Sequence, residues 1–192
     1  MIDKAIMFSA SAHKGMYRKG NHQPYIFHPL EVLSLVSMMS DDDEILCAAV
    51  LHDTVEDTPA TIEDIKNEFG ERVAKLVGSE SEDKRGQVNK AATWVDRKKE
   101  SIEEVKNNKD IGSKMICLAD KVSNLRSFHL LKLQEGDKMW DNFNMKDPKK
   151  HYWYYSEIAE ALIELKENAV YKELIFLIET IFNEYIKENE DE

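Results

Sequence analysis

The sequence has few of the residues that stabilise disulfide-rich or irregular folds: two cysteines, four prolines and seven glycines occur among its 192 residues. Cys47 and Cys117 both lie among apolar residues, where a buried free thiol is the usual outcome, so a structural disulfide is not expected. With 42% hydrophobic and 33% charged residues, and no low-complexity segment, the chain does not have the composition of a disordered protein. The composition predicts a helix-rich globular protein.

Long apolar runs and excess positive charge are also missing. No run approaches the roughly 20 residues that a membrane-spanning helix requires, and the chain opens with Met1-Ile2-Asp3-Lys4 rather than with a signal peptide. We therefore expect a cytoplasmic protein with no membrane partner. The net charge of −11 argues against nucleic acid as a partner, because phosphate would be repelled by most of the surface. A small anionic ligand is compatible with this charge where cations gather, as they do at Lys14, Arg18 and Lys19.

Apolar residues recur at helical spacing through most of the chain, and no segment has the alternation of a useful strand. We predict an all-α fold, a bundle of roughly eight to ten helices that forms one domain over residues 1–192, with a core at about 5–130 and C-terminal helices at about 147–188. The polar stretch Gly78 to Asn89, within the loop 78–92, is expected to form a mobile lid. Asn21 to Phe27 should be extended, and the expected helices are Ala5 to Lys14, Pro29 to Met39, Asp41 or Asp42 to Leu51, Ile62 to Phe69, Glu71 to Val77, Thr93 to Asn107, Gly112 to Leu130, Pro148 to Glu167 and Tyr171 to Lys187.

Four residues with side chains that ligate metals stand inside otherwise apolar helical contexts: His28, the adjacent His52 and Asp53, and Asp120. Burying a lone carboxylate costs several kcal/mol unless a cation or a hydrogen bond compensates it. Each residue alone is more often structural, as a hydrogen-bonded core histidine or a helix cap. Together, however, they favour one shared divalent cation, which would compensate all four burials.

These residues lie in three sequence motifs that resemble those of a known family. The order His, then His-Asp, then Asp is that of the HD superfamily, and the flanking residues resemble the hydrolases of the RelA/SpoT group. Three features are typical of its alarmone-hydrolase branch: Arg18-Lys19-Gly20 before the first histidine, Glu56-Asp57 after the pair, and Asn124 after the last aspartate. The resemblance covers about residues 5 to 130. The three motifs are Pro24-Tyr25-Ile26-Phe27-His28-Pro29-Leu30, Ala48-Ala49-Val50-Leu51-His52-Asp53-Thr54-Val55-Glu56-Asp57 and Leu118-Ala119-Asp120-Lys121-Val122-Ser123-Asn124-Leu125-Arg126.

The resemblance implies an all-helical domain that holds one divalent metal ion, expected to be Mn²⁺, through His28, His52, Asp53 and Asp120. Imidazole and carboxylate together suit such an ion, and open coordination positions would hold water and a phosphate oxygen. No histidine occurs between His52 and His129, which favours one metal over two.

Further roles follow from the same resemblance. Glu56 and Asp57, four residues beyond the His-Asp pair, would activate water and assist the leaving group. The alternative interpretation is that Asp57-Thr58-Pro59 is only a turn, without a catalytic role. Arg18 would stack on a guanine base, Lys19 would meet phosphate, and Asn124 would bond a ribose or phosphate. The alternative interpretation is that Arg18 and Lys19 belong to a solvated basic loop that binds no ligand.

The expected function is therefore metal-dependent removal of the 3′-pyrophosphate from the guanine nucleotide (p)ppGpp. Two alternatives stay open: an HD phosphohydrolase acting on another nucleotide or phosphomonoester, and a non-catalytic nucleotide-binding protein. The segment with Trp94, Arg97 and Lys98 departs from the best-known stand-alone hydrolases, which bears on the substrate more than on the reaction. A synthetase domain has no room in 192 residues, so synthesis of the alarmone is not expected. The sequence leaves open the oligomeric state and the roles of His13, Arg97 and Lys98.

Overall fold

The computed structural model describes residues 1–20, 22–79 and 92–190, with side chains as far as residue 185. Over these residues the chain is helical, and its only extended pairing is an isolated antiparallel bridge between Tyr17 and Pro24. The predicted all-α fold class is therefore confirmed. The loop expected over Gly78 to Asn89 lies almost wholly outside the described residues, so its role as a lid stays a prediction.

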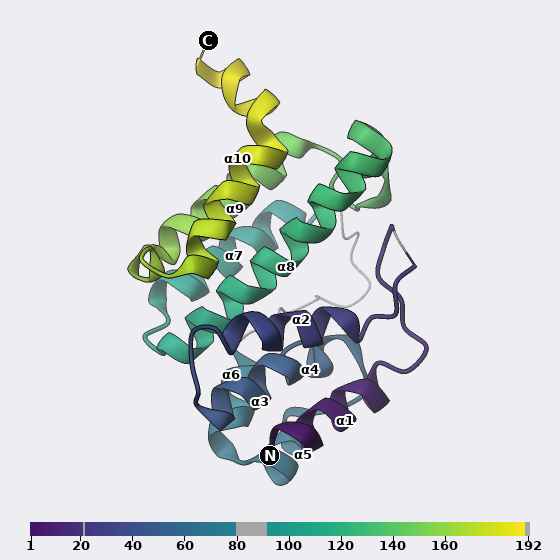
Figure 1. Cartoon of the computed structure of the whole chain (residues 1–192), viewed down its shortest axis with the longest axis vertical. Helices are drawn as coiled ribbons and strands as arrows, with labels where there is room; N and C mark the ends of the chain where they lie inside the picture. Colours follow the sequence, from purple (N-terminus) through teal and green to yellow (C-terminus); the bar gives the residue numbers. More distant parts are fainter. Residues whose placement is uncertain (21, 80–91, 191–192) are drawn as a thin grey trace. The chain divides into compact units, whose positions relative to one another are not determined.

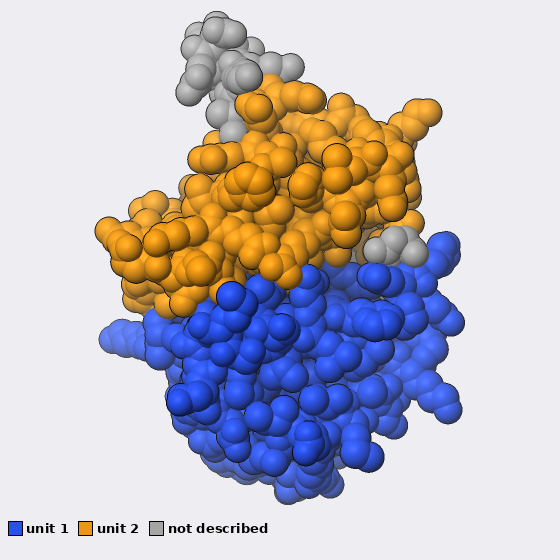
Figure 2. Space-filling model, in the orientation of Figure 1, with its two compact units in different colours: residues 1–18, 22–82, 108–120 blue, residues 19–21, 83–107, 121–192 orange. Residues whose placement is uncertain are grey.

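The chain divides into two compact units (Figure 2). Unit 1 comprises residues 1–18, 22–82 and 108–120, and unit 2 comprises residues 19–21, 83–107 and 121–192. The expectation of one domain over residues 1–192 stays a prediction. Among the described residues, no helix is both long enough and apolar enough to cross a membrane.

Unit 1 is built around helix α3 (Asp43–Leu51), which contacts α1, α2 and α6 (Figure 1). Every residue of α3 from Ile45 to Leu51 is buried, so this helix forms the centre of the unit's core. The other helices of the unit are α1 (Ile2–Ala12), α2 (Phe27–Val36), α4 (Thr54–Asp57), α5 (Ile62–Phe69), α6 (Glu71–Gly78) and the first part of α8 (Ile111–Glu135).

The helix ends in unit 1 follow from local side-chain chemistry. The Asp42 carboxylate accepts hydrogen bonds from two backbone amides in the first turn of α3, and Thr61 forms a capping box with Asp64 at the start of α5. Gly70 ends α5 with φ of 96°, a conformation that favours glycine. The sequence indicated each of these boundaries, because caps and glycine breaks depend on neighbouring residues alone.

Unit 2 packs α9 (Pro148–Ala161) against α7 (Trp94–Asn107) and α10 (Ala169–Glu190). The Asp147 carboxylate caps α9 by accepting from the Lys149 amide, and Pro148 occupies the first turn, as predicted. His151 is buried in this unit, with its ring stacked on Trp140 at a centroid distance of 5.0 Å. The unit also contains the end of α8 and the short 3-10 helices η1 (Gly136–Asn142) and η2 (Ile163–Leu165).

Several predicted helix boundaries were displaced; α8, for example, ends at Glu135 rather than at Leu130. Helix α2 begins at Phe27, two residues before the predicted start at Pro29; proline is tolerated there because the amides of the first turn have no intrahelical partner. Helix α9 ends at Ala161 rather than near Glu167, and a 3-10 turn follows it. The periodicity of apolar residues continues through that turn, so the sequence pattern did not mark the break.

Candidate metal centre

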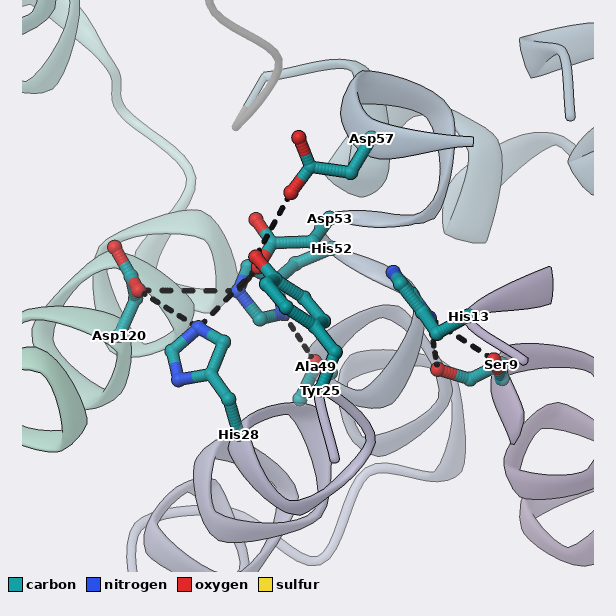
Figure 3. A network of polar contacts seen from close by, with 9 residues as sticks. All are labelled: Ser9, His13, Tyr25, His28, Ala49, His52, Asp53, Asp57 and Asp120. Atoms are coloured by element: carbon teal, nitrogen blue, oxygen red, sulfur yellow. Dashed lines mark hydrogen bonds and ion pairs between the residues drawn. The ribbon is translucent and has the colours of Figure 1, made fainter. Parts of the chain in front are cut away.

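The side chains of His28, His52 and Asp120 converge inside unit 1 (Figure 3). One potential ligand atom from each lies within 4.8 Å of the others. His28 is in the first turn of α2, His52 directly follows α3, and Asp120 is in the middle of α8. All three residues are buried. Three segments far apart in the sequence therefore present two imidazoles and a carboxylate to one point, which is a group suited to a divalent metal ion.

Asp53 joins this group through a single carboxylate oxygen. Its Oδ2 lies 3.2 Å from Nε2 of His28 and 3.2 Å from Nε2 of His52. Asp120 Oδ1 lies 3.2 Å and 3.8 Å from the same two nitrogens. The four residues expected to bind metal are thus neighbours in the structure, and their role as ligands remains our proposal.

His52 and Asp53 lie at the junction between α3 and α4. Helix α3 is buried through Leu51, and His52 caps it with helical backbone angles. Asp53 is then the N-cap residue of the short helix α4, with φ of −87° and ψ of −6°. Both side chains reach the candidate centre, where Oδ2 of Asp53 lies 3.2 Å from Nε2 of His52.

The ring of His52 is oriented by its own backbone. Its Nδ1 lies 2.8 Å from the Ala49 carbonyl oxygen, an acceptor, so Nδ1 carries a proton. Its Nε2 is buried without a hydrogen bond of good geometry and faces the carboxylates (Figure 3). A buried nitrogen of this kind needs a cation or a proton. The arrangement fits a metal ligand, because metal-binding histidines usually donate their other ring nitrogen to a carbonyl or carboxylate.

The charges at the site act on one another. Burial alone would lower the pKa of His52, but the Asp53 and Asp120 carboxylates outweigh it and raise that pKa to about 9. Burial would raise the pKa of Asp53, and the two imidazoles outweigh it and hold that pKa well below its usual range. Without a cation, the carboxylates therefore keep a proton on His52.

A divalent ion must displace this proton, so metal affinity should depend on pH. Because the pKa of His52 is about 9, we expect Mn²⁺ binding near pH 7 to release about one proton and to tighten about tenfold for each unit of rising pH, levelling off above about pH 9. Isothermal titration calorimetry in two buffers of different ionisation enthalpy measures the proton count. An affinity that stays constant between pH 6.5 and 8.5 would contradict this coupling.

The predicted acid/base pair lies on α4. The Asp57 amide donates to the Asp53 carbonyl oxygen at 2.9 Å, so one helical turn separates the two aspartates. Oδ2 of Asp57 lies 2.8 Å from the Tyr25 hydroxyl oxygen, which itself lies 2.7 Å from Asp53 Oδ2 (Figure 3). Asp57 is therefore linked to the candidate metal centre through Tyr25. Glu56 is half-buried on the same short helix.

Tyr25 was missed as a functional candidate by the sequence reasoning. Residues 22–26 have no regular periodicity, so no pattern indicated where this side chain would point. The one feature of the sequence that could have indicated a role for Tyr25 is its position three residues before His28, within the same motif. Burial and the two aspartates raise the pKa of Tyr25 far above its usual range, so its hydroxyl stays protonated and can donate to a carboxylate.

The predicted substrate residues have different surroundings. The Arg18 guanidinium lies 5.8 Å from the centre of the Tyr25 ring, Lys19 is exposed, and Asn124 is half-buried on α8, four residues after Asp120. Their contacts with a nucleotide stay predictions.

The residues whose roles the sequence left open also have partners. His13 is buried, and its ring stacks on Tyr25 with a centroid distance of 5.0 Å and an interplanar angle of 17°. In unit 2, Lys98 Nζ lies 4.8 Å from the centre of the Tyr154 ring, and Arg97 Nε lies 3.4 Å from Thr93 Oγ1. Lys98 thus has a structural partner on α9, and Arg97 has one in the residue that directly precedes α7.

Residues 5–140 match the family model of the HD domain. A guanosine-3′,5′-bis(diphosphate) 3′-pyrophosphohydrolase from Haemophilus influenzae is 36% identical over 127 residues, which is 66% of this chain and 18% of the relative. The chain spans a quarter or less of the length of the first curated relatives that it matches.

Two solved structures are similar to the chain over most of its length. The crystal structure of lmo0812 from Listeria monocytogenes EGD-e has a TM-score of 0.71 at 31% identity and covers 81% of this chain and 99% of that one. A metazoan ortholog of SpoT, described as hydrolysing ppGpp, has a TM-score of 0.72 at 24% identity, with 96% of this chain and 94% of that one covered. Both support the same helical fold.

Proposed function

The chain belongs to the HD domain family and is related to SpoT-type hydrolase domains, and from this premise we propose that it removes the 3′-pyrophosphate of (p)ppGpp. The products are GDP or GTP and pyrophosphate. One observation carries the proposal: two imidazoles and two carboxylates meet at a buried point, where Nε2 of His52 lacks a hydrogen bond. A phosphohydrolase needs such a site to bring a cation, water and phosphate together.

In this proposal His28, His52, Asp53 and Asp120 hold one divalent ion. Mixed imidazole and carboxylate ligation suits Mn²⁺, the ion we propose. When bound, the ion supplies Lewis-acid chemistry, since it polarises the phosphoryl group and lowers the pKa of a bound water. The Ala49 carbonyl holds the proton of the neutral His52 imidazole on Nδ1, which leaves Nε2 to face the ion once its own proton is displaced.

Glu56 and Asp57 do the proton transfers in this mechanism. Water forms a bond to the phosphorus attached to the ribose 3′ oxygen, and the bond between that phosphorus and the 3′ oxygen breaks. One carboxylate takes the proton from the attacking water, and the 3′ oxygen of the departing nucleotide is protonated. Asp57 is tied to Asp53 through the Tyr25 hydroxyl, which holds its carboxylate beside the candidate centre.

The nucleotide itself would be held by Arg18, Lys19 and Asn124. A planar guanidinium stacks on a guanine ring, whereas an ammonium acts on phosphate as a point charge. The Arg18 guanidinium lies 5.8 Å from the centre of the Tyr25 ring, and the hydroxyl of that tyrosine contacts Asp53 and Asp57. Asn124 follows Asp120 by one turn of the same helix and would bond a ribose or phosphate oxygen.

A nucleotide panel tests the function. The purified protein with Mn²⁺ is incubated with ppGpp, pppGpp, GTP, ATP and a phosphomonoester, and pyrophosphate and orthophosphate are measured separately. We expect pyrophosphate release from ppGpp and pppGpp, complete loss with a chelator, and recovery when Mn²⁺ is restored. Turnover of another nucleotide or of the phosphomonoester, without turnover of ppGpp, would leave a phosphohydrolase of different specificity. Binding of ppGpp without any turnover would point to a non-catalytic protein.

A further inference from the structure

The Tyr25 hydroxyl lies between two carboxylates of the candidate centre. Its oxygen is 2.7 Å from Oδ2 of Asp53 and 2.8 Å from Oδ2 of Asp57 (Figure 3). A phenol has one proton to donate, and both carboxylate oxygens are acceptors. The two aspartates therefore share one donor, and the position of each depends on the same oxygen atom.

We propose that Tyr25 is a positioning residue that holds the metal ligand Asp53 and the acid/base residue Asp57 in register through this one hydroxyl. The role of Asp57 in this inference rests on the proposed function, whereas the hold on Asp53 concerns metal binding alone. Partners of metal ligands fix the orientation of those ligands, and their loss typically costs about 10- to 100-fold in metal affinity or activity.

The tyrosine is itself held on several sides, as a positioning residue must be. Its amide donates to the Met16 carbonyl at 2.9 Å, and its carbonyl accepts from the His28 amide at 3.0 Å. Its ring stacks on His13, whose Nδ1 lies 2.9 Å from the Ser9 carbonyl oxygen. Tyr25 therefore has a fixed place although it lies outside any helix. This contact also gives His13 a role, which is to support the ring from behind.

The oxygen that Tyr25 contacts on Asp53 is the one nearest to both imidazoles. Asp53 Oδ2 lies 3.2 Å from Nε2 of His28 and of His52, so the hydroxyl restrains the very atom at the centre of the site. A carboxylate on a short side chain can rotate about two bonds, and a single hydrogen bond to one oxygen removes most of that freedom. Removal of the phenol hydroxyl should therefore affect metal binding directly, through the position of the Asp53 carboxylate.

Tyr25→Phe tests this inference because it keeps the ring, and with it the stacking on His13, while it removes only the hydroxyl. We expect the Kd for Mn²⁺ to rise about tenfold or more, and kcat for ppGpp at saturating Mn²⁺ to fall about 10- to 100-fold. KM should change less than about threefold, since the hydroxyl acts on the reacting end of the site. Calorimetric titration with Mn²⁺ and steady-state kinetics give these constants.

Tyr17→Phe is the matched control. It removes a hydroxyl from an exposed tyrosine of the same chain segment and should leave the Mn²⁺ Kd and kcat within about twofold of the parent. Thermal unfolding of each variant gives the folded fraction at the assay temperature, and the constants are expressed per folded molecule. A lower unfolding temperature for Tyr25→Phe, with Mn²⁺ affinity and kcat like those of the parent, would show a merely structural tyrosine and overturn the inference.

The two proposals fail in different ways. If the parent turns over no guanine nucleotide, the proposed function is wrong, and the Mn²⁺ titration of Tyr25→Phe still decides whether the hydroxyl positions Asp53. If the parent hydrolyses ppGpp and Tyr25→Phe loses neither metal affinity nor kcat, the function stands and the positioning role is wrong. A loss of kcat with unchanged Mn²⁺ affinity would contradict the hold on Asp53, which is half of the inference.

Discussion

Asp53→Asn should lower kcat/KM for ppGpp by at least about 10³-fold, which corresponds to roughly 4 kcal/mol of transition-state stabilisation. The substitution keeps the size of the side chain and its ability to accept from Tyr25, but it removes the negative charge of the oxygen that lies 3.2 Å from both imidazoles. An amide is a poor partner for a divalent ion in this setting, so Mn²⁺ affinity should fall as well. The pKa of His52, which Asp53 helps to raise, should fall toward its ordinary value.

The measurements are calorimetric Mn²⁺ titration and pyrophosphate release at a range of Mn²⁺ concentrations. Asp43→Asn makes the same chemical change on an exposed aspartate in the first turn of α3 and serves as the matched control. Asp120→Asn should repeat the result, because Asp120 faces the same two imidazoles. If Asp53→Asn binds Mn²⁺ like the parent and retains activity within about tenfold, the metal centre is not where we place it.

Much of unit 1 could be predicted because its signals are local. The cap at Asp42 and the break at Gly70 each depend on a few neighbouring residues, and the structure has them where the sequence indicated. The grouping of His28, His52 and Asp120 was also predictable, because burial of each such side chain among apolar residues needs compensation and a shared cation would provide it. Convergence itself was an inference from chemistry, and the structure bears it out.

Other features of the site depended on tertiary geometry that no periodicity encodes. The link between Asp53 and Asp57 requires a tyrosine from a segment without regular structure, and its hydroxyl position is set by contacts with His13 and the Met16 carbonyl. The ring orientation of His52 depends on a backbone carbonyl of its own helix. Contacts of this kind depend on which groups lie close together in the folded chain. The sequence alone therefore did not predict them.

The arrangement predicts that metal binding and proton transfer can be separated by mutation. Asp57→Asn should lower kcat by about 10²- to 10⁴-fold, the usual contribution of a positioned general acid or base. Its Mn²⁺ affinity should stay within about threefold of the parent, because the Tyr25 hydroxyl can still donate to Asp53 when Asp57 is neutral. This pattern differs from that expected for Asp53→Asn, which loses metal affinity and activity together.

Single-turnover hydrolysis of ppGpp at saturating Mn²⁺, with Asp43→Asn as the control, measures the chemical step for Asp57→Asn. Equal losses of metal affinity and rate would mean that Asp57 belongs to the metal site rather than to proton transfer. A rate within about tenfold of the parent would shift the acid/base role to Glu56, which shares helix α4. The corresponding Glu56→Gln variant decides that case, because the carboxylate that takes the proton of the attacking water is the one whose neutral variant loses the chemical step.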